Sequence, residues 1–206
     1  MIAVDLGESV ELAERNTRGT GRVACVQADI RDTPIRDHCI DLAYSLGVLH
    51  HIADTEGAVK AVSRTLREGG AMLLYLYYSL ETRGRLYRAL FTLVGSARGV
   101  TSRLPQPALE ALTTALAACV YWPLARASRV VRLLNSSLAD RIPLSFYGDL
   151  SFTMMRNDSL DRFGTRLEKR FSRADVHELL QRAGLMDVRV ADTLPYWHAI
   201  GFKSPI

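Results

Sequence analysis

Lysine is scarce in this chain, which has only Lys60, Lys169 and Lys203 among its 26 basic residues. The remaining positive charge is arginine, which is interspersed with 22 acidic residues, and no block of like charge occurs. The net charge of +4 is therefore not gathered into the stripe that typifies nucleic-acid-binding proteins. We expect a mildly basic soluble protein with no nucleic-acid partner.

Cysteine is also scarce, and Cys25, Cys39 and Cys119 are too widely spaced to form the C-x-x-C pairs of zinc or redox sites. Reduced thiols in a cytoplasmic protein are the simplest explanation. A signal peptide is lacking as well, because the start MIAVDLGESV has no basic segment and carries Asp5 where an apolar core would be needed. Secretion is therefore not expected.

Hydrophobic residues make up 48% of the 206 residues, enough for a substantial core. Short apolar runs alternate with helical patterns in the first part of the chain. Strands are predicted at 2–6, 23–26, 40–45 and 71–77, and helices at 9–18 and from the N-cap Asp54 to a stop at Gly69 and Gly70. This alternation predicts an α/β fold with a Rossmann-like, mostly parallel sheet.

The end of the chain shows the same kinds of signal. Ser172 and Asp175 have the spacing of a helix capping box, and Gly184 would end that helix. Strands are then predicted at 185–190 and 196–202, joined by a turn around Pro195.

Residues 79–150 carry almost only helical signals, with predicted breaks at Gly99 and Pro105. We interpret them as a helical lid or substrate insert within a single domain that spans residues 1–206. The apolar run Ala108–Leu124 falls short of a membrane span, and a basic ridge follows it at Arg126, Arg129 and Arg132. A lid over a hydrophobic acceptor is favoured over peripheral membrane contact.

Polar residues end the predicted strands, where ligands of parallel sheets bind. Asp5 could accept hydrogen bonds from both hydroxyls of a ribose, and Asp29 could accept from an adenine amine while Ile30 covers the base. Such an Asp is more commonly a turn or cap residue. Two acids on consecutive strands nevertheless favour a nucleoside site.

Four segments in this order resemble a class I S-adenosylmethionine-dependent methyltransferase of the type 11 domain kind. They are IAVDLGESVELAERN, VQADIRDTPI, IDLAYSLGVLHHIADTEGAVKAVSRTLREGGAMLLYLY and FSRADVHELLQRAGL. The resemblance implies S-adenosylmethionine as the cofactor and a C-terminal strand that is antiparallel to the others. It also implies cofactor contacts at Asp5, Leu6, Asp29, Ile30, Ser45 and Gly47, with His51 facing the methyl acceptor.

One part of the family pattern is missing. A first strand, a glycine-rich loop and a helix should precede Ile2, and Gly19-Thr20-Gly21 cannot replace that loop because it follows a helix. The missing strand lies in the family between the strands at 2–6 and 40–45, so its loss would leave two unpaired edges. We expect that roughly 40 residues are absent through an incomplete sequence.

The adjacent histidines His50 and His51 have no further His or Cys close enough in sequence to complete a metal site, so no metal is expected. His51 is interpreted either as an acid/base or substrate contact or as a pocket-lining residue, and His50 as structural.

The leading hypothesis is methyl transfer to a small acceptor, which the apolar insert would allow to be lipophilic. A truncated, non-catalytic methyltransferase-like interaction subunit is the alternative, with the missing strand donated by a partner. A nicotinamide-dependent oxidoreductase fits the segment LGVLHH and the Gly-Gly turn less well.

Overall fold

The structure is a computed structural model that describes residues 1–80, 84–139, 142–191 and 196–204. The chain forms two compact units, one of Met1–Thr82 with Leu167–Ile206 and one of Arg83–Arg166. The first is an α/β unit and the second is helical. The helical unit includes the residues up to 166 because its last helix packs on two earlier ones.

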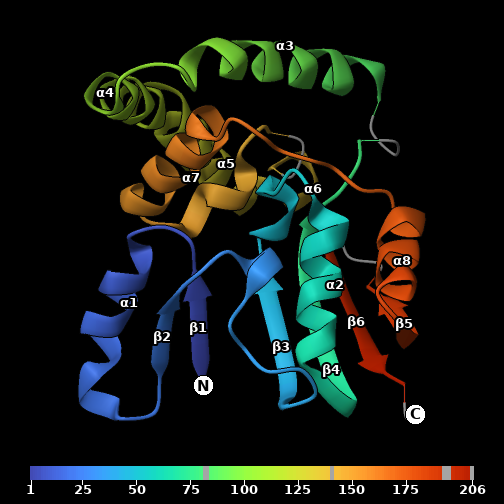
Figure 1. Ribbon diagram of the computed structural model, residues 1–206. Helices are drawn as coiled ribbons and strands as arrows, with labels where there is room; N and C mark the ends of the chain where they lie inside the picture. Colours follow the sequence, from blue (N-terminus) through green and yellow to red (C-terminus); the bar gives the residue numbers. More distant parts are fainter. Residues whose placement is uncertain (81–83, 140–141, 192–195, 205–206) are drawn as a thin grey trace. The chain divides into compact units, whose positions relative to one another are not determined.

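The α/β unit has the predicted alternation of strands and helices (Figure 1). Its strands are β1 (Ile2–Asp5), β2 (Ala24–Gln27), β3 (Ile40–Leu46), β4 (Leu66–Tyr77), β5 (Leu185–Val190) and β6 (Tyr196–Lys203). Its helices are α1 (Ser9–Thr17), α2 (Thr55–Thr65) and α8 (Arg173–Arg182), with 3-10 turns η1 (Arg18–Thr20), η2 (Ile30–Asp32) and η3 (Leu49–His51).

The strands form two sheets that are not hydrogen-bonded to each other in the described residues. β1 and β2 make a parallel pair, and the second sheet has the order β3-β4-β6-β5. β3 and β4 are parallel, whereas β6 runs antiparallel to both β4 and β5. The predicted mostly parallel α/β fold with an antiparallel final strand is confirmed.

The core lies on one face of the four-stranded sheet, where β4 contributes Met72, Leu74 and Leu76, all fully buried. They pack against apolar side chains of α2 and α8, such as Val59 and Leu180. Burying each of these side chains stabilises the fold by roughly 1.5–3 kcal/mol relative to leaving it in water. The two helices are therefore held on the sheet by β4.

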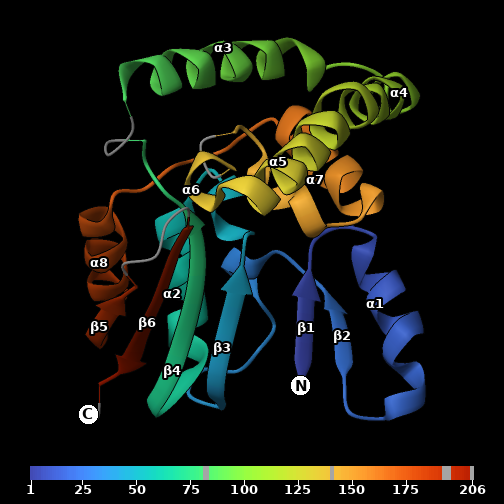
Figure 2. The same cartoon turned by 180° about the vertical axis from the view of Figure 1, so that it is seen from behind.

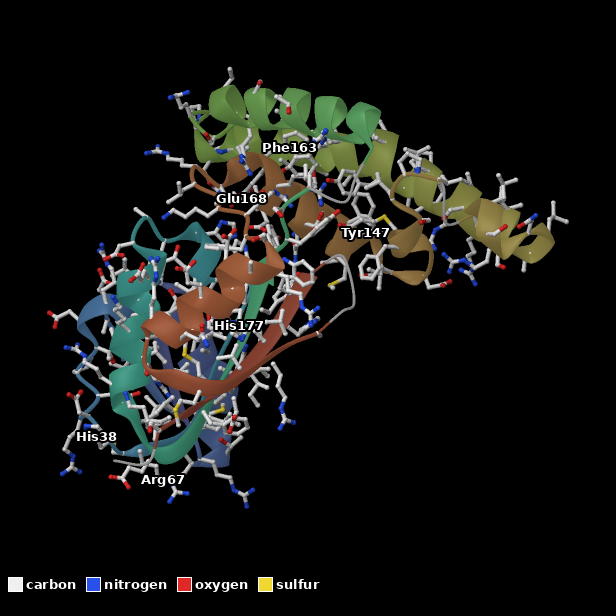
Figure 3. The ribbon with its side chains drawn as sticks, turned by 90° about the vertical axis from the view of Figure 1, so that its right-hand side faces the viewer. His38, Arg67, Tyr147, Phe163, Glu168 and His177 are labelled. Atoms are coloured by element: carbon white, nitrogen blue, oxygen red, sulfur yellow. The ribbon has the colours of Figure 1, made fainter. Side chains whose placement is uncertain are left out.

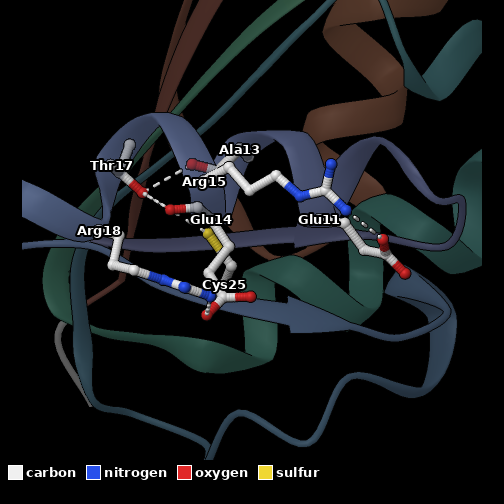
Figure 4. A network of polar contacts seen from close by, with 7 residues as sticks. All are labelled: Glu11, Ala13, Glu14, Arg15, Thr17, Arg18 and Cys25. Atoms are coloured by element: carbon white, nitrogen blue, oxygen red, sulfur yellow. Dashed lines mark hydrogen bonds and ion pairs between the residues drawn. The ribbon is translucent and has the colours of Figure 1, made fainter.

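Helix α1 covers the two-stranded sheet and is stabilised largely by local contacts (Figure 4). Arg15 pairs with Glu11 and Arg18 with Glu14, each one turn apart on an exposed face. Such pairs contribute only a few tenths of a kcal/mol each. The Thr17 hydroxyl lies 4.0 Å from the Cys25 sulfur and thus connects the helix end to β2.

The boundary between α2 and β4 differs from the prediction. Asp54 caps α2 as expected, accepting from the Gly57 amide at 2.8 Å, but the helix ends at Thr65 rather than at Gly69 and Gly70. Leu66 is extended and fully buried, so burial of this side chain starts the strand earlier. Gly70 lies inside β4, where a Cβ atom would come within 3.0 Å of the Ile40 carbonyl oxygen.

The start of α8 confirms the predicted capping box. The Ser172 hydroxyl accepts from the Asp175 amide at 3.1 Å, and the Asp175 carboxylate accepts from the Ser172 amide at 2.8 Å. Gly184 follows the helix with a φ of 77°. The predicted turn around Pro195 lies outside the described residues.

The helical unit contains α3 (Arg85–Thr101), α4 (Gln106–Leu116), the π-helical turn η4 (Ala117–Tyr121), α5 (Trp122–Leu134), α6 (Ser136–Ala139), the 3-10 turn η5 (Ser145–Asp149) and α7 (Phe152–Gly164). Helix α3 continues through Gly99, so the predicted break there is wrong, whereas α4 does begin after Pro105. Helix α7 contacts α3 and α4. A small core holds this unit together, formed by Ala117, Tyr121, Ala125, Tyr147 and Met155.

Residues 106–134 form one continuous helical stretch, longer than the apolar run Ala108–Leu124. By length and composition alone it could cross a membrane. The predicted basic ridge is engaged within the unit: Arg126 donates to the Gly148 carbonyl at 2.7 Å, and Arg129 and Arg132 each lie 3.5 Å from the Asp149 carboxylate.

His50 is a buried polar residue of the α/β unit, with its side chain fully inaccessible to water. Its ring stacks on Tyr77 with centroids 3.9 Å apart and lies 4.1 Å from the ring of His51. Burial, together with the nearby positive charges of His51 and Arg170, lowers the pKa of His50 from 6.5 to about 3. The neutral imidazole is therefore the form that the fold accommodates, as its predicted structural role requires.

We predict that the free energy of unfolding decreases as the pH falls from about 6.5 towards 3, because the unfolded chain protonates His50 more readily than the folded chain does. Its contribution is at most about 1.4 kcal/mol per pH unit. The His50→Phe variant, which keeps an aromatic ring but cannot ionise, should lose this part of the slope in urea unfolding at pH 7, 6 and 5. The matched control is His177→Phe on exposed α8, which should keep the wild-type slope. Equal slopes for His50→Phe and the unmodified chain would contradict the assignment.

Candidate functional site

The first group of predicted residues lies where β1 and β2 end. Asp5 is opposite Gln27 in the register, so Asp5 and Asp29 follow at the same edge of this sheet. The Gln27 side chain donates to the Leu6 carbonyl at 3.1 Å, which connects the two loops. The exposed Asp5 carboxylate accepts from the Gly7 amide at 2.7 Å with Oδ1, and its Oδ2 has no hydrogen bond in the described residues. Asp5 is thus both a turn residue and an acceptor open to a ligand.

Asp29 is the N-cap of η2 and is bound by Arg31. The Arg31 amide donates to its Oδ1 at 2.9 Å, and the guanidinium contacts both carboxylate oxygens, the shortest distance being 2.5 Å from Nη2 to Oδ2. These hydrogen bonds lower the pKa of Asp29 to about 2, so it is ionised at neutral pH. Ile30 is partly buried against the main core. The structure therefore gives Asp29 a loop-fixing role, and its contact with adenine stays a prediction.

The second group follows the end of β3. Ser45 is opposite Leu74 of β4, and the Gly47 amide donates to the Tyr75 carbonyl at 3.1 Å. Gly47 has a φ of 78°, and a Cβ atom there would lie 3.2 Å from the Tyr75 ring. A larger residue would be strained and crowded, so glycine is what allows the chain to turn sharply into η3.

His51 is held by a segment from the far end of the chain. Its Nδ1 lies 2.8 Å from the carbonyl oxygen of Leu167. Because a carbonyl can only accept, Nδ1 carries the proton and the lone pair of the neutral ring is on Nε2. The Lys169 amide donates to the His50 carbonyl at 2.9 Å, which fastens the same segment across η3. The ring of His51 is therefore oriented with a basic nitrogen directed away from its anchor.

The sequence did not reveal two charged residues beside the histidines, Glu168 and Arg170 (Figure 3 labels Glu168). The Arg170 guanidinium lies 2.6 Å from the largely buried Glu168 carboxylate, donates to the Tyr78 carbonyl at 3.2 Å and lies 5.3 Å from the Tyr77 ring centroid. No local motif marks these residues, since they are about 90 positions away from Tyr77 in the chain.

The predicted residues therefore form two groups at the carboxyl ends of parallel strands. Asp5, Leu6, Asp29 and Ile30 belong to the first, and Ser45, Gly47 and His51 to the second. No described hydrogen bond joins the groups. In the described residues no three His, Cys, Asp or Glu side chains gather as metal ligands. Two surface hollows lie along α8, and neither is lined by a predicted residue.

The order in which successive strands are added across the unit reverses between these groups. From β1 the chain proceeds to β2 on one side, and from β3 it proceeds to β4 on the other, while β1 and β3 point the same way (Figure 1). In open α/β sheets, ligands bind at such a reversal, outside the carboxyl ends of the strands. Asp5 and Gly47 flank this position.

Residues 1–74 match the sequence model of a family described as "Methyltransferase domain". Among curated proteins, a probable tRNA methyltransferase 9B of Mus musculus is 35% identical over 101 residues, which is 48% of this chain and 21% of that protein. A putative methyltransferase of Encephalitozoon cuniculi is 36% identical over 67 residues, 31% of this chain and 32% of that protein. The chain thus spans a fifth to a third of the length of these relatives.

Solved structures resemble nearly the whole chain in fold. A putative methyltransferase of Bacillus halodurans has a TM-score of 0.53 at 12% identity, covering 99% of this chain and 83% of that one. Human N-acetylserotonin methyltransferase in complex with S-adenosylmethionine has a TM-score of 0.53 at 15% identity, covering 99% of this chain and 40% of that one.

The sequence match covers the part of the chain that carries the predicted site residues, and the shared fold covers almost all of it. Residues 1–74 are therefore similar to a methyltransferase domain, and the fold of the chain resembles that of solved methyltransferases.

Proposed function

We propose that this protein transfers a methyl group from S-adenosylmethionine to a small acceptor. The observation that carries the proposal is the pair of groups where the strand order reverses. The exposed carboxylate of Asp5 lies on one side and the oriented imidazole of His51 on the other. An exposed carboxylate can accept hydrogen bonds from the hydroxyls of a ribose, and an imidazole with a defined tautomer can accept a proton from an acceptor.

The residues present fit the cofactor unevenly. Asp5 fits best, because its Oδ2 can accept from a ribose hydroxyl while Oδ1 keeps the turn at Gly7. Ser45 and Gly47 would lie near the methionine part. Asp29 fits less well, because an adenine amine would have to share its carboxylate with Arg31. When bound, S-adenosylmethionine supplies the methyl group on a positively charged sulfur.

His51 is proposed to take a proton from the acceptor through Nε2. Methyl transfer from a sulfonium depends mainly on alignment and on exclusion of water, so a base is needed only if the acceptor loses a proton. The Leu167 carbonyl holds the protonated nitrogen on the other side of the ring.

The acceptor is proposed to be small and lipophilic. Val48, which is 52% exposed, lies in the turn before His51, and the Tyr77 ring lies 6.0 Å from the His51 ring. Apolar and aromatic surroundings of this kind favour an acceptor that is mostly apolar and carries one nucleophilic atom. A nucleic-acid acceptor is the competing case, since one relative is named as a probable tRNA methyltransferase.

Asp5→Asn should weaken binding of S-adenosylhomocysteine by about 10- to 100-fold, because the amide keeps one oxygen for Gly7 but removes the charged acceptor from the ribose. Isothermal titration calorimetry measures the affinity. Glu8→Gln is the matched control, with the same loss of charge three residues away, and should bind as the unmodified chain does. Equal affinities for Asp5→Asn and Glu8→Gln would remove Asp5 from the site.

His51→Asn should lower turnover by about 10²- to 10⁴-fold with little change in S-adenosylhomocysteine affinity, because the amide can still donate to Leu167 but cannot act as a base. Turnover is measured as S-adenosylhomocysteine formation, with His177→Asn on α8 as the control. A variant that keeps the rate would assign His51 to pocket lining.

Small phenols and amines with apolar substituents should accept a methyl group, whereas unmodified tRNA should not. The measurement is transfer of a radiolabelled methyl group from S-adenosylmethionine to each acceptor at equal concentration. Labelling of tRNA alone would replace the proposed acceptor class by nucleic acid.

A further inference from the structure

The helical unit contains one long helix, residues 106–134, that is packed on one side only. It runs through α4, η4 and α5 without a break, and α6 lies beyond its end (Figure 2). Its packed side chains recur at steps of three or four residues and are almost completely buried: Thr113, Ala117, Tyr121, Ala125 and Ser128. This spacing places them on one side of the helix, so the opposite side is left out of the core of the unit.

That opposite side carries large apolar residues, which we call the apolar row: Trp122, Val130, Leu133 and Leu134. The last three have the helical spacing i, i+3, i+4 and are 61%, 83% and 87% exposed, and Trp122 is 46% exposed. Single exposed apolar residues are normal on a protein surface, whereas several on one face of a helix mark an interaction surface. The row therefore has the composition of a contact face.

The charge beside the apolar row is positive. Glu110 is the only acidic residue in the sequence of the long helix and lies near its start, whereas three arginines follow Trp122. The Arg126 guanidinium lies 5.8 Å from the Trp122 ring centroid, and the Arg129 side chain is 61% exposed. The ion pair of Arg129 with exposed Asp149 is long, at 3.5 Å, and such pairs are weak. An anionic partner would complement this face.

We propose that the apolar row inserts into the surface of an anionic lipid bilayer, with the long helix lying parallel to the membrane plane. Leucine and valine side chains would enter the boundary between headgroups and acyl chains, and Trp122 would lie at the headgroup level. Arg126 and Arg129 would contact the lipid phosphates. The sequence favours this segment as a lid, and the proposal goes beyond that role because the row lies on the side facing away from the core of the unit.

A membrane-spanning orientation is disfavoured, although the long helix has sufficient length. Spanning would place Arg126 and Arg129 in hydrocarbon, which is costly for charged side chains. It would also separate the buried side of the helix from its packing partners, among them Tyr147 and Met155. An orientation in the interface keeps this packing and leaves the arginines at the headgroups.

A second copy of the chain is also a poorer occupant of the apolar row. A two-fold interface uses the same patch on both copies, so it would bring Arg126 and Arg129 of one copy near those of the other. The acidic residue of the long helix, Glu110, is too far from the row to compensate them. Like charges oppose such an interface, whereas an anionic membrane supplies the opposite charge.

Vesicle binding tests the proposal with the 206-residue chain. It should bind vesicles with roughly one third phosphatidylglycerol in phosphatidylcholine about tenfold or more tightly than pure phosphatidylcholine vesicles, because the arginines are attracted to anionic lipid. Added salt should weaken this preference by screening. The measurement is co-sedimentation with each kind of vesicle.

The double variant Leu133→Ser with Leu134→Ser should bind the anionic vesicles about 100-fold less tightly, since each buried leucine contributes roughly tenfold. Both side chains are exposed, so its urea midpoint should match that of the unmodified chain. The matched control replaces two exposed apolar residues elsewhere, Leu12→Ser with Val100→Ser, and should bind as the unmodified chain does.

Tryptophan fluorescence reports whether the row itself enters the lipid. The emission of the unmodified chain should shift to shorter wavelength on anionic vesicles, because the Trp122 ring leaves water. The shift should be lost in Trp122→Phe, which leaves Trp197 as the remaining tryptophan.

The proposal is overturned by equal binding to both kinds of vesicle, by equal losses in the double variant and its control, or by an unchanged emission. Bound protein that resists extraction with alkaline carbonate would show a span instead. A dimer in solution that the double variant dissociates would assign the row to a second copy. These measurements use no cofactor and no acceptor, so their failure is distinct from a failure of the proposed function.

Discussion

The α/β unit depends on strand β4, which is paired along its length with β3 on one side and β6 on the other. Its alternate side chains Met72, Leu74 and Leu76 are fully buried under α2 and α8. In the described residues both β4 and β6 are paired on two edges, but the two longest pairings are those of β4 with β3 and with β6. Segments from both ends of the chain are therefore positioned through β4. The carboxyl end of this strand is also where the aromatic ring of Tyr77 meets the histidines.

The turn after β3 shows how this frame positions His51, the proposed base. Gly47 permits the left-handed backbone that directs the chain into η3, and His50 fills the buried position under Tyr77. The neutral imidazole of His50 packs there as an apolar ring would. His51 is then oriented by Leu167, so the first and last parts of the unit must both fold before the tautomer is defined.

The reversal of strand order between β1 and β3 is the place of the proposed cofactor site. Ligands of open sheets bind at such a point because the loops diverge there and leave room above the strand ends. Asp5 and Gly47 lie on the two sides of it, on sheets that share no described hydrogen bond.

The sequence by itself determined the order of strands and helices, the caps at Asp54 and Ser172, and the residues at the strand ends, because these depend on local periodicity and on hydrogen bonds within a few residues. It misplaced the end of α2, since burial of Leu66 and its pairing with β3 outweigh the stop signals at Gly69 and Gly70. It also gave no sign that Arg31 forms an ion pair with the Asp29 carboxylate, or that the segment with Glu168 and Arg170 returns to the histidines. Those contacts were decided by the tertiary structure, because they join residues through space and the long-range packing around β4 sets which of them meet.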